Sequence, residues 1–235
     1  GKLFTETLIA QASSGASIEV EATAVKSELE ASSGADIDAE KLTTTDCRAE
    51  ASSGADIECH CTDGIDFLIE TNRRFDLIYI DPARRDDHGR KVSAFESCTP
   101  NILDNMDLLL SKADHILIKS SPMIDISMAL NQLRNVISIT VLSVRNECKE
   151  ILFLCSAKTI TSSTTYRCVN IRTDGGMDEL TFSRETECTL AIPYTASVGN
   201  YIYDPNVSLL KAGAFKTVAH TYNVSKLHRN THLYT

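Results

Sequence analysis

The stretch that decides the fold is Phe75-Asp-Leu-Ile-Tyr-Ile-Asp81-Pro82-Ala83-Arg84-Arg85. Its residues 77–80 form a continuous apolar run, which is typical of a central parallel strand covered on both faces. Because Pro82 has no backbone N–H to donate to a sheet, the strand is predicted to end at Asp81. The sequence therefore predicts a carboxylate, a rigid proline turn and two arginines at the carboxyl edge of a sheet, where open α/β sheets bind ligands.

Strands and helices alternate on both sides of this stretch. Apolar residues at helical spacing predict helices over 64–72, 101–112 and 126–135. Short apolar runs predict strands over 57–61, 115–120, 136–144 and 150–156, the last two forming an antiparallel pair around a turn. Because strands separated by helices imply right-handed crossovers, we expect an α/β fold whose sheet is otherwise parallel.

The composition of the chain changes after Ala157. Residues 159–165 are rich in Ser and Thr, and two short strands are predicted over 166–171 and 180–182 around Gly175-Gly176. We therefore expect a first domain over 1–158 and a small α+β domain over 159–235. A domain of that size is marginally stable alone, so we expect it to dock on the first.

Residues 1–58 contain a repeat. Ala-Ser-Ser-Gly-Ala occurs at 12–16, 31–35 and 51–55. A period near 20 residues is typical of stacked repeats. However, three copies with so few apolar residues between them would bury little surface, so we do not predict a solenoid. Residues 1–56 are left poorly defined by the sequence.

The composition narrows the classes of partner. The net charge of −9 and the pI near 5.1 argue mildly against nucleic acid, although Arg84, Arg85 and the segment 90–91 could form a local basic patch. No apolar run approaches the ~20 residues of a membrane span, and no secretory pattern opens the chain. The eight cysteines are scattered, as is usual for reduced thiols, so a cytoplasmic location is expected.

Several separated motifs resemble those of one enzyme family. Asp81-Pro-Ala-Arg-Arg85 resembles motif IV of class I S-adenosylmethionine (SAM)-dependent methyltransferases. Together with Gly89-Arg-Lys91 and Ser97-Cys-Thr-Pro100, it is similar to the "DPARR…GR…SP" run of the methyltransferases that carry a C-terminal THUMP-like domain. Segments 119–123, 146–150, 203–215 and 226–234 resemble later parts of that family in the same order.

This resemblance covers roughly residues 57–235. It implies a Rossmann-like class I methyltransferase sheet within 1–158, a THUMP-like domain over 159–235, and SAM as cofactor. RNA is the acceptor that the family favours. Two alternatives stay open: a non-catalytic module that binds SAM or RNA, and a methyltransferase acting on a small molecule or a protein. An RNA enzyme should lose affinity steeply as salt rises, whereas the other acceptors should not.

The resemblance also assigns roles around the acid-proline turn. Asp81 and Pro82 would orient the methyl acceptor, and Arg84 would hold it. Arg85 and Lys119 would bind the substrate. The simpler alternatives are a strand-ending turn, a pair of ion-paired arginines and a lysine at a strand end. Ala83 and Arg84 replace the second proline and the aromatic of related enzymes, so the ring that stacks on a flipped base is missing.

The cofactor residues are assigned in the same way. Asp63, followed by Gly64, resembles the acid that accepts a hydrogen bond from the SAM adenine, although it could equally cap the following helix. Asp36 resembles the acid that binds the ribose hydroxyls, and Gly15 lies in a weak first motif. Asp81 is expected to contact the cofactor as well. We expect no metal, because no second cysteine pair follows Cys59-His-Cys61.

Overall fold

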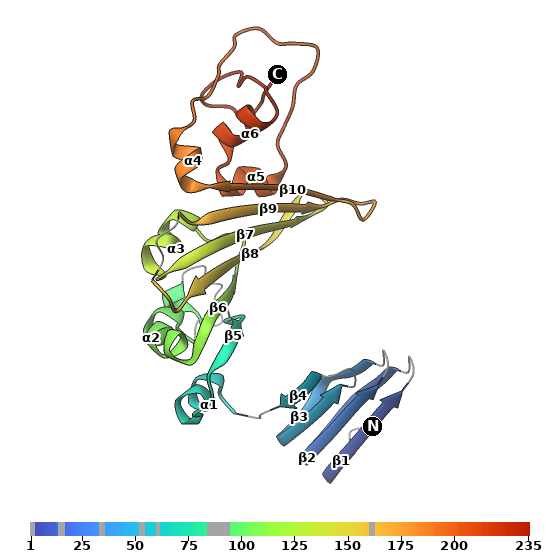
Figure 1. Cartoon of the computed structure of the whole chain (residues 1–235). Helices are drawn as coiled ribbons and strands as arrows, with labels where there is room; N and C mark the ends of the chain where they lie inside the picture. The colour runs from blue at the N-terminus through green and yellow to red at the C-terminus, as the bar shows by residue number, and fades with distance from the viewer. Residues whose placement is uncertain are drawn as a thin grey trace. The chain divides into compact units, whose positions relative to one another are not determined.

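The computed structural model describes residues 3–13, 17–32, 36–51, 55–59, 62–83, 95–159 and 163–235, and for 3–59 we describe the backbone alone. The chain divides into two compact units, residues 1–70 and 71–235 (Figure 1). Each unit is described by itself.

The first unit contains a four-stranded sheet in the order β1-β2-β3-β4 (Figure 1). The first three strands are parallel, and the last is antiparallel to its neighbour. The short helix α1 follows this sheet. The elements are β1 (Leu3–Ser13), β2 (Ser17–Ser32), β3 (Asp36–Ala51), β4 (Ala55–Cys59) and α1 (Gly64–Glu70).

The copies of the repeat lie side by side in this sheet. Ala12 is paired with Ala31, and Ala31 is paired with Ala51, so register partners are separated by one repeat. The described strands are therefore paired in register with the repeat, an arrangement that the sequence interpretation did not predict. The sequence argument counted only apolar residues, whereas parallel strands are also joined by hydrogen bonds between their backbones, which residues of any type can form.

The second unit is built on a mixed six-stranded sheet in the order β10-β9-β7-β8-β6-β5. The α/β class is confirmed, but the sheet is mixed rather than parallel with one closing pair. The pairs β5–β6 and β7–β9 are parallel, and the other three are antiparallel. The strands are β5 (Phe75–Ile80), β6 (Ala113–Ser120), β7 (Val136–Val144), β8 (Glu147–Ser156), β9 (Thr165–Ile171) and β10 (Met177–Ser183).

One face of this sheet carries the core. Ile118, Phe153 and Ile139 stand opposite one another on β6, β8 and β7, and all three are fully buried. Phe95, in the short 3-10 helix η1 (Phe95–Ser97), packs edge-on against Phe153 with 5.7 Å between ring centroids. The helix α2 (Ile102–Lys112) contacts β6 and buries Ile102, Met106 and Leu109, which recur at helical spacing. The next helix is α3 (Ile126–Gln132).

The two strands after residue 158 extend the same sheet. β9 pairs with β7, and β10 pairs with β9, so the predicted boundary falls between strands of one sheet. Three short helices follow: α4 (Arg184–Thr189), α5 (Val207–Ala212) and α6 (Phe215–Thr221). The side chain of Asn146 accepts a hydrogen bond of 2.9 Å from the backbone N–H of Val207, which ties α5 to the turn between β7 and β8.

The C-terminal segment is held by specific polar contacts. Glu187 in α4 accepts hydrogen bonds of 2.7 and 2.8 Å from the backbone N–H groups of Lys216 and Thr217. These bonds satisfy donors at the start of α6, whose own N-cap residue provides no side-chain acceptor. Tyr234 is fully buried, and its hydroxyl donates to the carbonyl of Phe215 at 3.0 Å.

Within the described residues, every helix is too short or too polar to cross a bilayer. The thiols of Cys148, Cys155, Cys168 and Cys188 form no disulfide bonds. Burial raises the pKa of Cys155 and of Cys168 to about 12, so both thiols stay protonated in the folded protein.

Candidate functional site

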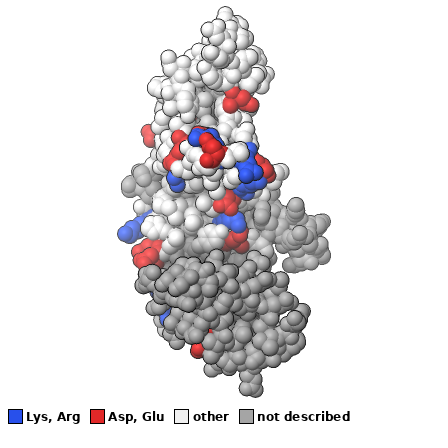
Figure 2. All heavy atoms as spheres, turned by 90° about the vertical axis from the view of Figure 1, so that its right-hand side faces the viewer, with Lys and Arg blue, Asp and Glu red and all other residues white. Residues whose placement is uncertain are grey.

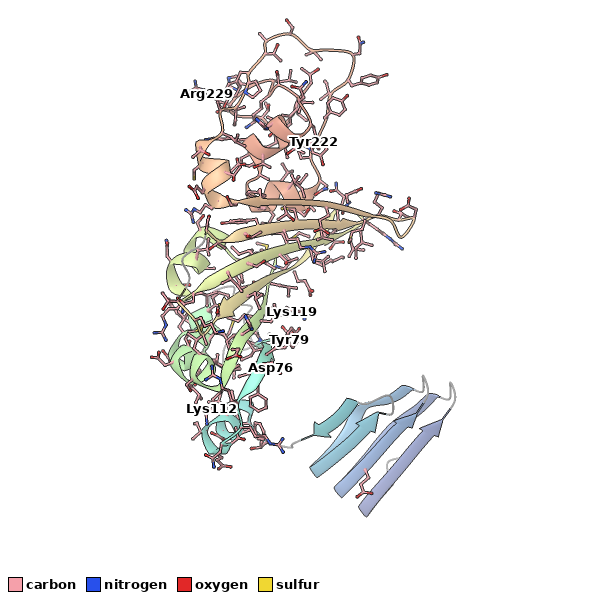
Figure 3. All side chains as sticks on the ribbon, viewed as in Figure 1. Asp76, Tyr79, Lys112, Lys119, Tyr222 and Arg229 are labelled. Carbon is pink, nitrogen blue, oxygen red and sulfur yellow. The ribbon has the colours of Figure 1, made fainter. Side chains whose placement is uncertain are left out.

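Asp81 and Lys119 meet at the carboxyl edge of the six-stranded sheet. β5 and β6 are parallel, with Ile80 opposite Ile118, so the next residue of each strand reaches the same level of the edge. The ammonium of Lys119 lies 2.5 Å from Oδ2 of Asp81, with side chains 28% and 43% exposed. Figure 3 shows Lys119 beside Tyr79 on the neighbouring strand. The two side chains form an ion pair that remains open to solvent.

The turn after Asp81 is fixed by backbone hydrogen bonds. Pro82 is buried, and Ala83 forms an isolated antiparallel bridge with Thr99. The N–H of Ala83 donates to the Thr99 carbonyl at 2.8 Å, and the N–H of Thr99 donates back at 3.1 Å. The bridge joins Ala83 to Thr99, so Asp81 lies two residues before a fixed point of the chain.

The hydrogen bond and charge of Asp81 raise the pKa of Lys119 above its usual value of 10.5. Partial burial opposes this effect but does not cancel it. Lys119 is therefore an ammonium group at neutral pH, and it holds one oxygen of the Asp81 carboxylate.

This pKa shift predicts the pH dependence of stability. The folded state binds the Lys119 proton more tightly than the unfolded state, so the ion pair stabilises the fold below about pH 10.5. The stabilisation is lost as the pH rises through the folded-state pKa. We expect Lys119→Met to lower the free energy of unfolding by up to about 1 kcal/mol at pH 7, because the pair is partly exposed. Urea titrations at pH 7 and above pH 11 measure the difference, which should vanish at the higher pH. A difference that grows with pH would contradict this assignment.

The residues assigned to the adenine have a structural role in the first unit. Oδ1 of Asp63 accepts hydrogen bonds from the backbone N–H groups of Ile65 at 2.8 Å and Asp66 at 3.3 Å, so Asp63 caps α1. Gly64 has open space where a side chain would begin. Both residues are exposed. The capping alternative is thus realised, while contact with SAM stays a prediction.

Of the other assigned residues, the structure describes only the backbone of Asp36. Asp36 is the first residue of β3 and is paired with Ser17 of β2. Gly15, Arg84 and Arg85 lie outside the described residues. No group of three or more His, Cys, Asp or Glu side chains within the described ranges could hold a metal ion.

The structure corrects the interpretation of β5. The apolar run 77–80 predicted a central strand covered on both faces, but β5 is the edge strand of the sheet. Leu77 is 50% exposed and Tyr79 is 55% exposed. The prediction is wrong because an apolar run shows that a strand needs cover, but not which part of a protein supplies it. Within the described residues, one edge of β5 and one of its faces remain uncovered.

Charges on the molecular surface are mixed. In the view of Figure 2, the coloured Lys and Arg side chains lie next to Asp and Glu side chains rather than in a separate area. Ion pairs in the second unit include those of Arg167 with Glu179, at 2.7 Å, and of Arg172 with Asp174, at 3.3 Å. The described part of this face therefore carries no extended basic area of the kind that attracts a phosphate backbone.

Two sequence families match parts of the chain. Residues 201–235 match a ferredoxin-like domain, and residues 1–71 match the family described as "Putative auto-transporter adhesin, head GIN domain". No curated protein matches the chain. The second match ends within one residue of the boundary of the first structural unit, so sequence and contacts agree that residues 1–70 form a unit of their own.

A solved structure resembles most of the chain. The crystal structure of a "putative methyltransferase" from Porphyromonas gingivalis W83 is 28% identical to it, with a TM-score of 0.64. The match covers 90% of this chain and 52% of that one, so the chain spans about half the length of the protein that it resembles. This similarity supports a methyltransferase-like fold. The ferredoxin-like match falls within the segment for which a THUMP-like domain was expected, and the THUMP-like assignment stays a prediction.

Proposed function

We propose that this chain acts in SAM-dependent methyl transfer on a class I, Rossmann-like sheet. The observation that carries the proposal is the position of the Asp81-Pro82 turn. It lies at the carboxyl edge of two parallel strands, held by Lys119 and by the bridge to Thr99, in a chain whose fold is similar to that of a methyltransferase. A rigid, solvent-accessible acid at that edge is what positioning of a methyl acceptor requires.

One donor group of SAM matches the exposed carboxylate of Asp63. The adenine amino group would donate to Oδ2 of Asp63, because Oδ1 already accepts the two bonds that cap α1. On the motif resemblance alone, Asp36 and Gly15 would complete the cofactor site. When bound, SAM supplies a methyl carbon attached to a positively charged sulfur. The chain itself provides hydrogen-bond acceptors and fixed geometry rather than a nucleophile.

Asp81 would orient the acceptor. Its carboxylate accepts a hydrogen bond from an N–H or O–H of the substrate, which turns a lone pair of that atom towards the methyl carbon. Lys119 holds Oδ2 of the same carboxylate at 2.5 Å and so limits its rotation. Arg84 and Arg85 follow two and three residues beyond Pro82 and would hold an anionic part of the substrate.

RNA is the acceptor that we propose, on the motif resemblance alone. The net charge of −9 and the mixed charges in Figure 2 weigh against it, so the acceptor must be tested directly. A binding module is the second candidate. It is favoured by the uncovered edge and face of β5, together with the half-length match to the methyltransferase structure.

Calorimetric titration with SAM and S-adenosylhomocysteine tests the cofactor. We expect micromolar binding that Asp63→Ala weakens strongly. Because Asp63 also caps α1, Asp63→Asn provides the matched variant: it retains a capping oxygen but lowers the negative charge offered to the adenine. Absence of binding by the intact chain would overturn the enzyme proposal and leave the binding module. Transfer of labelled methyl groups to RNA, protein and small-molecule fractions would then identify the acceptor.

A further inference from the structure

A pocket of about 390 Å³ opens in the C-terminal part of the second unit, away from Asp81 in sequence. Its apolar floor is formed by Leu209 of α5, Val218 of α6 and Val224. Its size and apolar lining fall in the range of sites that hold small molecules. The pocket belongs to none of the roles assigned above.

Three tyrosines line this pocket. Tyr203 and Tyr234 are joined by two backbone hydrogen bonds, of 2.9 and 3.0 Å, so their side chains lie on the same side of a short ladder. Tyr222 follows α6 and lies one helical turn beyond Val218 (Figure 3). Tyr234 is buried, whereas Tyr203 and Tyr222 are 51% and 57% exposed. The pocket therefore has a fixed aromatic base and two aromatic side chains at its rim.

The charge at the pocket is negative. Among its lining residues in the described part of the chain, Asp204 is the only acidic or basic residue, and it is exposed next to Tyr203. The nearby Lys226 is buried and lies over the ring of Phe215, 5.0 Å from its centroid, so its charge is directed to that ring. Aromatic faces and a carboxylate both attract a cation, and neither favours an anion.

We propose that this pocket binds a small organic cation, an ammonium ion that carries methyl or other alkyl groups. The faces of Tyr203 and Tyr222 would contact the cation, Asp204 would balance its charge, and the apolar floor would receive its alkyl groups. The phosphates of a nucleotide would meet the Asp204 carboxylate in a chain whose net charge is already −9. This site is independent of the methyl-transfer proposal.

Titration by NMR with choline chloride and with 3,3-dimethylbutan-1-ol tests the site. The alcohol is neutral and has nearly the same shape as choline, so the difference in affinity between the two measures the contribution of the charge. We expect choline to bind about fivefold to thirtyfold more tightly than the alcohol. Acetylated trimethyllysine amide carries the same cation on a peptide side chain. Tighter binding of this compound would identify a protein as the source of the cation, and tighter binding of choline a free metabolite. Both results support the site.

Two variants locate the binding. Asp204→Asn and Tyr222→Leu should each weaken choline binding at least about fivefold. Tyr194→Leu is the matched control, because Tyr194 is 55% exposed but does not line the pocket. Equal affinity for choline and the alcohol would overturn the proposal, as would tighter binding of adenosine. Undetectable choline binding at 50 mM, about the weakest affinity worth measuring by this method, would also overturn it.

Discussion

Replacement of Asp81 by alanine is expected to lower the rate of methyl transfer at least about 100-fold, because the acceptor loses the group that aligns it. The fold should tolerate the change. Asp81 is exposed, lies beyond the end of β5, and takes part in only a partly exposed ion pair. The measurement is single-turnover methyl transfer with the acceptor that the labelling experiment identifies.

Two further variants separate alignment from simple charge. Asp81→Asn keeps an oxygen that accepts a hydrogen bond, so it should retain more activity than Asp81→Ala. Asp76→Ala is the matched control, since Asp76 is an exposed acid on β5, five residues before Asp81 (Figure 3). Its activity should be unchanged. Equal losses in Asp81→Ala and Asp76→Ala would show that Asp81 has no specific role.

Calorimetry on the same variants distinguishes the functions of the turn. If Asp81 mainly orients the acceptor, Asp81→Ala should retain most of its affinity for SAM while losing transfer. If SAM affinity falls as steeply as the rate, Asp81 is a cofactor residue instead. The sequence interpretation allowed both roles, and only this comparison assigns them.

The sequence predicted the second unit well because its local signals are strong. The apolar spacing of α2 and the run of β6 match the observed elements within two residues at each end. The ion pair of Asp81 with Lys119 follows from one fact of topology: the two strands that precede these residues are parallel neighbours. Predicting where these two strands end was therefore enough to place both residues at one edge of the sheet.

The sequence was less informative about features that depend on which strands pair with each other. β9 and β10 follow the Ser/Thr-rich stretch at which a domain boundary was predicted, and β9 pairs with β7 in the same sheet. The repeat in 1–58 was judged by its apolar content, yet its strands are joined by backbone pairing. Which strands become neighbours depends on pairing between residues far apart in the sequence, and composition and local periodicity do not specify that pairing.

Strand β5 is less covered than its sequence predicts. Its apolar run predicts cover on both faces, and the described residues leave Leu77 and Tyr79 about half exposed. The similar methyltransferase structure is about twice as long as the part that this chain matches. The calorimetric titration with SAM measures whether the chain binds the proposed cofactor while this face of β5 is exposed.

The core around Phe153 should dominate the stability of the second unit. Phe153→Ala is expected to lower the free energy of unfolding by about 3–5 kcal/mol, because it removes a fully buried ring from the centre of the sheet. It also removes the edge-on contact with Phe95, whose ring is 1% exposed. All seven tyrosines lie between residues 79 and 234 and the chain has no tryptophan, so tyrosine fluorescence during urea unfolding reports on this unit alone.

Leu154→Ala is the matched control for this prediction. Leu154 is the next residue of β8, its side chain points to the opposite face, and it is only partly buried. Leu154→Ala should lower the free energy of unfolding by less than half as much as Phe153→Ala. Phe153→Leu should fall between the two, because it keeps most of the apolar volume but loses the ring contact. If Phe153→Ala and Leu154→Ala destabilise equally, the two faces of β8 are equally buried in solution. The face that carries Leu154 would then have to be covered by something other than the described residues of the second unit.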